Sequence, residues 1–223
     1  VPASLILGVG IGLSVLGGIG LLPMLGLTLA AGLAVASVLP LRGRELRRTP
    51  LAVWGMVVAH LGIAVALFGM ASDSAWTKER LVAVSPGEST QVGPWKVTLK
   101  SVVPVAGPNW TALEGELLVS YAGARPVAVH PQSRSFWSPV QQTTESELVT
   151  RWNGQLYAVL GDEAEDGRWQ LRLWWKPFVT LIWLGGIMIA LGGVLALIGR
   201  VASDVRRHVA RGKIAYRRAR QGR

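Results

Sequence analysis

Residues 49–70 read TPLAVWGMVVAHLGIAVALFGM, and from residue 51 onward this run is apolar except for His60. A helix rises about 1.5 Å per residue, so this run spans roughly 30 Å, the thickness of the hydrocarbon core of a bilayer. Thr49 and Pro50 are residue types preferred at the cap and the first position of a helix. We therefore predict a transmembrane helix over 51–70, with His60 near the middle of the membrane.

Two different faces are predicted for this helix. Small residues, spaced by three and four, form a face that lets a second helix approach closely in lipid. They are Ala52, Gly55, Ala59, Gly62, Ala66 and Gly69. His60 lies well away from this small-residue face, among apolar side chains. These are Val53, Met56, Val57, Ile63, Ala64 and Leu67.

An ionisable residue at this depth is a candidate functional residue. An imidazole set in an apolar wall suits axial ligation of a flat cofactor. A structural histidine, bonded to a backbone carbonyl or to a polar residue of a neighbouring helix, is an equal alternative. No second histidine lies in an apolar run of this chain, so a second ligand would come from outside it.

Charge and hydropathy are typical of a membrane protein. Hydrophobic residues make up 50% of the chain and the net charge is +10. Loop 42–48 has four arginines against one glutamate, and tail 200–223 has nine basic residues against one acidic residue. Because both segments flank apolar runs, the positive-inside rule places them in the cytoplasm and argues against nucleic-acid binding. The chain has no cysteine, which excludes disulfides, thiolate ligands and haem attached through its own thiols.

The other apolar runs predict further spans. Residues 1–41 carry no charge, and Pro23 is expected to divide them into helices over 3–22 and 24–41 joined by a tight turn. No basic segment precedes them, so they do not resemble a signal peptide. The chain begins with valine, and we expect it to be the later part of a longer or a split polypeptide.

Residues 178–198 predict the last span. Trp174, Trp175 and Lys176 are expected to anchor its outer edge at the membrane interface. Gly186 and Ala190 are expected to form its helix-packing face.

Residues 72–176 differ in character, with balanced charge and short alternating runs. Strands are predicted at 95–100, 117–121, 126–130, 156–160 and 169–175. Turn signals separate them, at Pro86-Gly87, Gly93-Pro94, Gly107-Pro108-Asn109, Ala122-Gly123 and Asp166-Gly167. This spacing favours a small antiparallel barrel or sandwich.

The predicted fold class is thus an α-helical membrane protein with about four transmembrane helices and an inserted, small, all-β extracytoplasmic domain. Residues 1–71 would hold three transmembrane helices with a basic cytoplasmic loop at 42–48. Residues 72–176 would form the periplasmic β domain, and 177–199 the last transmembrane helix. Residues 200–223 would be a basic cytoplasmic tail, either a helix on the anionic leaflet or a solvated segment.

Several short motifs follow one another along the chain. They are Gly55-Met56-x-x-Ala59-His60, Gly107-Pro108-Asn109-Trp110, His130-Pro131-x-x-Arg134 with Phe136 and then Thr144-Glu145, Leu156-Tyr157-x-x-Leu160-Gly161, and Lys176-Pro177-Phe178. In this order, and around a helix, β domain and helix layout, they resemble the C-terminal portion of CcmF, the haem lyase family of cytochrome c-type biogenesis. Gln132-Ser133 replaces an acidic–basic pair of that family, and Gln155 stands where an aspartate is usual.

The resemblance implies that His60 is an axial ligand to the iron of a b-type haem, haem b, held in the membrane. It implies a component of the haem lyase (cytochrome c synthase) that assists covalent attachment of haem to apocytochrome c. The family's other transmembrane histidine and its tryptophan-rich segment lie upstream of the part that this chain matches. We therefore expect activity to require that upstream half, and we assign no catalytic residue.

The same resemblance implies the partners and the place. The partners would be the upstream CcmF portion or a split partner, other cytochrome c maturation proteins, a haem carrier protein and apocytochrome c, with quinol as a candidate electron donor. The place would be the bacterial inner (plasma) membrane, with the β domain in the periplasm and no contact with nucleic acid.

A second hypothesis is a non-catalytic assembly or docking subunit whose β domain binds a partner protein and whose His60 is structural. A transporter or channel segment is a weaker third, because no charge beyond His60 marks an ion path.

The remaining polar and aromatic residues favour ordinary roles. His130 suits a turn better than a second haem ligand, and His208 suits the surface. The acidic cluster Asp162, Glu163, Glu165 and Asp166 favours a solvated hairpin loop over a cation site. Tryptophans 95, 110 and 169 are expected to fill the β core, with haem stacking as an alternative for Trp110.

Overall fold

The computed structural model describes residues 18–221 of the chain, which divides into two compact units. The helical unit is Val1–Ala71 with Leu181–Arg223, and the β unit is Ser72–Thr180. Three helices of the described residues are long and apolar enough to cross a membrane: Leu21–Leu41, Leu51–Trp76 and Thr180–Val209. The predicted span over 3–22 lies almost wholly outside the described residues.

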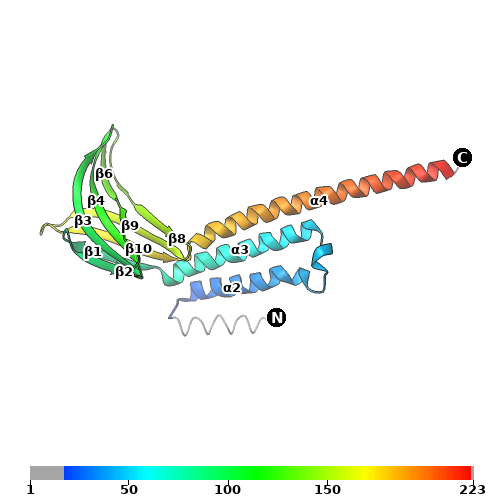
Figure 1. Cartoon of the computed structure of the whole chain (residues 1–223), viewed down its shortest axis with the longest axis horizontal. Helices are drawn as coiled ribbons and strands as arrows, with labels where there is room; N and C mark the ends of the chain where they lie inside the picture. Colours follow the sequence, from blue (N-terminus) through cyan, green and yellow to red (C-terminus); the bar gives the residue numbers. More distant parts are fainter. Residues whose placement is uncertain (1–17, 222–223) are drawn as a thin grey trace. The chain divides into compact units, whose positions relative to one another are not determined.

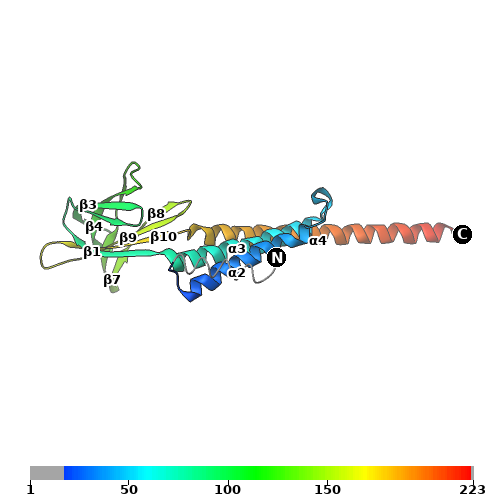
Figure 2. The same ribbon diagram turned by 90° about the horizontal axis from the view of Figure 1, so that it is seen from below.

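The helical unit contains α2 (Leu21–Val38) and most of α3 (Leu51–Trp76) and α4 (Thr180–Gln221), side by side in Figures 1 and 2. Two short 3-10 turns, Leu39–Leu41 and Leu46–Arg48, carry the chain from α2 to α3. The start of α2 packs on the end of α3, since a Cβ added to Gly26 would lie 2.8 Å from that of Ala71. The two helices are therefore antiparallel.

The sequence predicted that Pro23 divides two spans, but in the structure it lies inside a helix. The left-handed turn lies earlier, at Gly18 with φ +60°, and α2 begins at Leu21. Pro23 occupies the first turn of α2, where a helix has no partner for its amide hydrogens and tolerates a residue that lacks one.

The small-residue face of α3 packs against α4, as predicted. A Cβ added to Gly62 would lie 2.8 Å from the carbonyl oxygen of Gly185 and 2.8 Å from the amide nitrogen of Ile189. Gly55 meets Gly192 in the same way, and Ala52 meets Gly199. Backbone thus lies directly on backbone at every second turn, an approach that only glycine permits.

The predicted packing face of α4 was wrong. No atom of the described residues lies within 4 Å of a Cβ added to Gly186, and Ala190 is exposed. The buried positions are Gly185, Gly192 and Gly199, seven residues apart, a spacing that keeps them on one side of the helix. Helix α4 also continues without a break through the basic tail to Gln221.

The β unit is a sandwich of two antiparallel sheets. One has the order β1-β10-β9-β8; the other has the order β2-β3-β4-β6-β7, with β5 paired to β4. The strands are β1 (Lys78–Val84), β2 (Ser89–Val92), β3 (Trp95–Ala106), β4 (Trp110–Tyr121), β5 (Val127–Val129), β6 (Gln132–Trp137), β7 (Val140–Glu145), β8 (Glu147–Arg151), β9 (Gly154–Glu163) and β10 (Trp169–Pro177). The five predicted strands and the predicted all-β domain are confirmed.

Alternate residues of β3, β4, β9 and β10 form the core between the sheets. Leu99, Leu117, Leu160 and Leu171 are fully buried there. Trp175 joins them at 7% exposure, 6.3 Å from the ring of Trp95. It is a core residue of the β unit and not the interfacial anchor that its place beside an apolar run suggested.

Candidate functional site

His60 lies on α3, and the described residues leave its side chain exposed. Its Nδ1 is 2.8 Å from the carbonyl oxygen of Met56, one turn earlier. Because a carbonyl oxygen can only accept, Nδ1 carries the proton, and the lone pair of the neutral ring is then on Nε2. This is the tautomer that a metal ligand bound through Nε2 requires.

A hollow of about 160 Å³ lies beside this imidazole, within the helical unit. Its walls come from α2 and the following turn on one side and from α3 on the other. They are Leu33, Ala36, Ser37, Pro40, Met56 and His60. The Ser37 hydroxyl donates to the carbonyl oxygen of Leu33 at 2.6 Å, so it presents little polarity to the hollow. Among the described residues that line the hollow, the imidazole is the one polar side chain that remains available.

Some of the apolar residues predicted to surround His60 are buried, and others are exposed. Val57 and Ala64 are buried at 4% and 3% exposure. Met56 and Ile63 stay 39% and 43% exposed on the same side as the imidazole. In a membrane, such an exposed apolar surface is covered by lipid or by further helices. His60 is therefore at the edge of the described helices, where a second chain segment or a flat ligand has access.

A second group of motif residues meets on the outer face of β4, β6 and β7. The guanidinium of Arg134 lies 4.4 Å over the Trp110 ring and 3.2 Å from the carboxylate of Glu145. Its Nε donates to Gln132 at 2.7 Å, and Gln132 donates in turn to Glu114. Motifs far apart in the sequence thus form one hydrogen-bonded patch. Trp110 is half-buried under arginine rather than in the core.

The other candidate residues occupy surface positions. His130 is exposed after β5, and His208 is exposed with its Nδ1 3.3 Å from the Asp204 carbonyl oxygen. The acidic cluster lies at the β9–β10 hairpin, where Arg168 donates to Asp166 at 2.7 Å. That hydrogen bond lowers the pKa of the Asp166 carboxyl. Among the described residues, no group of three or more His, Asp and Glu side chains could hold a metal ion.

Known proteins similar to this chain include both its helices and its β unit. Residues 75–177 match the family model described as the CcmF C-terminal β-sandwich. "Cytochrome c-type biogenesis protein CcmF" of Escherichia coli (strain K12) is 36% identical over 176 residues, which cover 78% of this chain and 27% of that protein. The chain belongs to the CcmF family. It corresponds to the C-terminal portion of the members that it matches.

Other CcmF relatives agree in extent. The Pseudomonas aeruginosa protein of the same name is 35% identical over 147 residues, covering 66% of this chain and 22% of that protein. "Cytochrome c-type biogenesis protein CycK" of Bradyrhizobium diazoefficiens is 36% identical over 154 residues, 69% of this chain and 23% of that protein. The chain thus spans about a quarter of the length of these relatives.

A solved structure supports the fold. "Cytochrome c Heme Lyase CcmF" superposes with a TM-score of 0.71 at 24% identity, over 87% of this chain and 33% of that one. The arrangement of long apolar helices with an inserted β sandwich is therefore that of CcmF.

Proposed function

We propose that this chain is a component of a membrane haem lyase of cytochrome c maturation, in which His60 is an axial ligand of a haem b held in the membrane. The observation that supports it is the Nδ1 contact with the Met56 carbonyl, which leaves Nε2 of His60 as an unprotonated nitrogen beside an apolar hollow. When bound, the haem would supply one-electron chemistry. This chain's residues would fix the imidazole and keep its surroundings apolar.

The place of His60 along α3 suits this role. It lies nine positions after Leu51, the start of the helix, or about 14 Å along the axis, which is near the middle of a bilayer core. At that depth the imidazole has no water to bond, so an iron atom is a favourable partner.

The hollow beside His60 is smaller than an ordinary ligand pocket. Its volume is 160 Å³, against about 300–1,000 Å³ for typical small-molecule sites. It therefore fits one edge of a macrocycle, and the remaining surface would come from the upstream CcmF portion or a split partner. The further partners would be other cytochrome c maturation proteins, a haem carrier protein and apocytochrome c, with quinol as a candidate electron donor. The location would be a bacterial inner membrane with the β domain in the periplasm.

The first experiment is a reduced-minus-oxidised visible spectrum of the detergent-purified chain, produced together with the upstream portion. Wild type should give a b-type signal, and His60→Ala should remove it while the yield of folded protein is kept. The matched control is His130→Ala, which changes an exposed histidine of the β unit and should leave the signal intact. The proposal would be contradicted if the b-type signal survived in His60→Ala. It would also be contradicted if the wild type gave no b-type signal.

A second candidate function is a non-catalytic docking subunit. The bond between Nδ1 and the Met56 carbonyl also satisfies a structural histidine, and this observation favours the alternative. His60→Gln separates the two hypotheses. Its amide could donate to the Met56 carbonyl but would be a poor ligand for haem iron, so a structural role predicts an unchanged assembly and the haem proposal predicts loss of the spectrum.

A further inference from the structure

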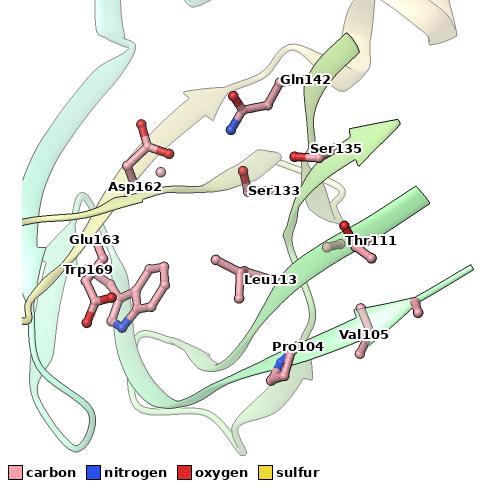
Figure 3. A pocket seen from close by; sticks show the side chains of 13 residues that line it. Pro104, Val105, Thr111, Leu113, Ser133, Ser135, Gln142, Asp162, Glu163 and Trp169 are labelled. Atoms are coloured by element: carbon pink, nitrogen blue, oxygen red, sulfur yellow. The ribbon is translucent and has the colours of Figure 1, made fainter. Parts of the chain in front are cut away.

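An open cleft of about 520 Å³ lies between the two sheets at one end of the β unit (Figure 3). Figure 3 shows Leu113 and Trp169 beside the hollow that Ser133, Gln142 and Asp162 also surround. This volume is within the range of ordinary ligand sites, about 300–1,000 Å³. The cleft belongs wholly to the β unit and is separate from the His60 hollow.

The cleft exists because one sheet extends beyond the core. Leu117 and Leu113 lie four residues apart on β4, so both point inward. Leu117 is fully buried, whereas Leu113 is 39% exposed. Between them, Gly115 packs on Leu160 at the end of the buried layer, where an added Cβ would lie 3.3 Å from Leu160 Cδ1. Leu113 is therefore an inward-facing apolar side chain that the opposite sheet does not cover.

Polar side chains on both walls of the cleft lack partners. Ser133 and Ser135 of β6 and Gln142 of β7 line one wall, and Asp162 and Glu163 of β9 line the other. Within the described part of the chain, none of these five side chains takes part in a hydrogen bond or an ion pair. The cleft thus offers hydroxyl and amide groups on one wall and two carboxylates on the other, around an apolar floor.

Unpaired strand edges border the same cleft. Among the described residues, β7 is the last strand of its sheet and pairs only with β6. On the other side, β8 pairs with β9 no further than Ala158, so no described strand pairs with the outer edge of β9 from Val159 to Glu163. Free edges bind extended chains through their backbone groups.

We propose that this cleft binds an extended peptide segment of a partner protein in which apolar and basic residues alternate. An apolar side chain would pack on Leu113 and Trp169, and the lysines or arginines would pair with Asp162 and Glu163. The peptide backbone would bond to the free edge of β7 and to the hydroxyls of β6. The period of two in an extended chain places such side chains on alternate sides. This inference does not depend on haem binding by His60.

The test uses the full chain in nanodiscs of neutral lipid and a fluorescein-labelled octapeptide of alternating lysine and valine. Fluorescence polarisation measures its dissociation constant. The double variant Asp162→Asn with Glu163→Gln should weaken binding by about tenfold, as expected for two charge pairs at a surface. Leu113→Lys should also weaken it, because it places a cation on the apolar floor. The matched control is Glu165→Gln, an acidic residue of the same hairpin that does not line the cleft.

Three comparisons decide the result. The lysine–valine peptide should bind more tightly than a serine–valine peptide of the same length, and Glu165→Gln should bind it as the wild type does. Equal weakening in Glu165→Gln would show attraction by the whole acidic hairpin and would overturn the cleft as the site. Unchanged binding in the double variant, or no binding of the peptide to the wild type, would overturn it as well. Far-ultraviolet circular dichroism of each variant confirms that the β unit is folded.

Discussion

Arg134 links three strands through one side chain. It stacks on Trp110, pairs with Glu145 and donates a hydrogen bond to Gln132, at 26% side-chain exposure. Arginine suits this position because its planar guanidinium can lie flat on an indole ring and still donate in its own plane. The motif residues singled out from the sequence therefore stabilise the sheet that carries the cleft wall.

Arg134→Met should lower the free energy of unfolding by about 1–2 kcal/mol, since it removes a partly buried ion pair and a cation–π contact. Denaturant titration followed by tryptophan fluorescence measures the change. Arg172→Met is the matched control, because Arg172 also stacks on a tryptophan, Trp174, and pairs with Glu79 at 2.8 Å, but at 54% exposure. A loss as large for Arg172→Met would show that burial of the arginine does not matter.

The Asp166 carboxyl offers a prediction on pH. Its pKa is lowered by the hydrogen bond from Arg168, while the unfolded chain should show the ordinary value of about 3.9. Because the pKa is lower in the folded state, the ionised carboxylate stabilises the hairpin at any pH above the pKa of the unfolded chain. This contribution is lost as the pH falls through the pKa of the folded state. A carboxyl-detected NMR titration should place the pKa of Asp166 below the ordinary value of an aspartate. Arg168→Gln should raise the pKa of Asp166 toward that ordinary value, and no rise would contradict the assignment.

At the scale of elements, the packing of α3 on α4 depends on which glycine of each pair faces inward. The sequence has neighbouring glycines at 185 and 186 and again at 192 and 193. Small residues alone could not say which of them packs, because that depends on the direction of the partner helix. The spacing of seven that joins Gly185, Gly192 and Gly199 was the signal that could have decided it.

The neighbouring glycines 185 and 186 give a direct test, because the same change to leucine can be made at each. Gly185→Leu should destabilise the helical unit by about 1–3 kcal/mol or more, because even a Cβ there would lie 2.5 Å from the amide nitrogen of Ala66. Gly186→Leu should change stability by less than about 0.5 kcal/mol, since no atom in the described part of the chain lies within 4 Å of its added Cβ. Thermal unfolding in detergent and the yield of folded protein measure both. Equal losses would contradict the inward position of Gly185.

Strands β6 and β7 show why part of the β unit escaped prediction. An alternating apolar pattern arises where one face of a strand is buried in a core. The inward faces of β6 and β7 border the open cleft, so they carry Ser133, Ser135 and Gln142 instead of apolar residues. Strands β3, β4, β9 and β10, whose alternate residues form most of the core, had the pattern and were found. The missing signal and the open cleft have the same physical origin.

At the scale of the whole molecule, sequence reasoning reached the class of protein but not every boundary. Long apolar runs have one stable form in lipid, so the helices were predictable. Trp175 was assigned to the membrane edge because it adjoins an apolar run, whereas its alternation with Leu171 and Leu173 belongs to β10. His60 could be found because a single polar residue in such a run is conspicuous. The hollow beside it depends on α2, whose position the sequence did not show.

The orientation of the chain in the membrane is the last prediction. The positive-inside rule places loop 42–48 and the tail in the cytoplasm and the β unit on the opposite side. Because the chain has no cysteine, single cysteines report position without background. Glu165→Cys, in the exposed β9–β10 hairpin, should react with a membrane-impermeant maleimide in intact spheroplasts. Arg44→Cys should react only after the membrane is permeabilised. Ala158→Cys, buried at 1% exposure, should stay unlabelled until the protein is denatured. Labelling of Arg44→Cys and Glu165→Cys from the same side would contradict a β domain separated from the basic loop by α3.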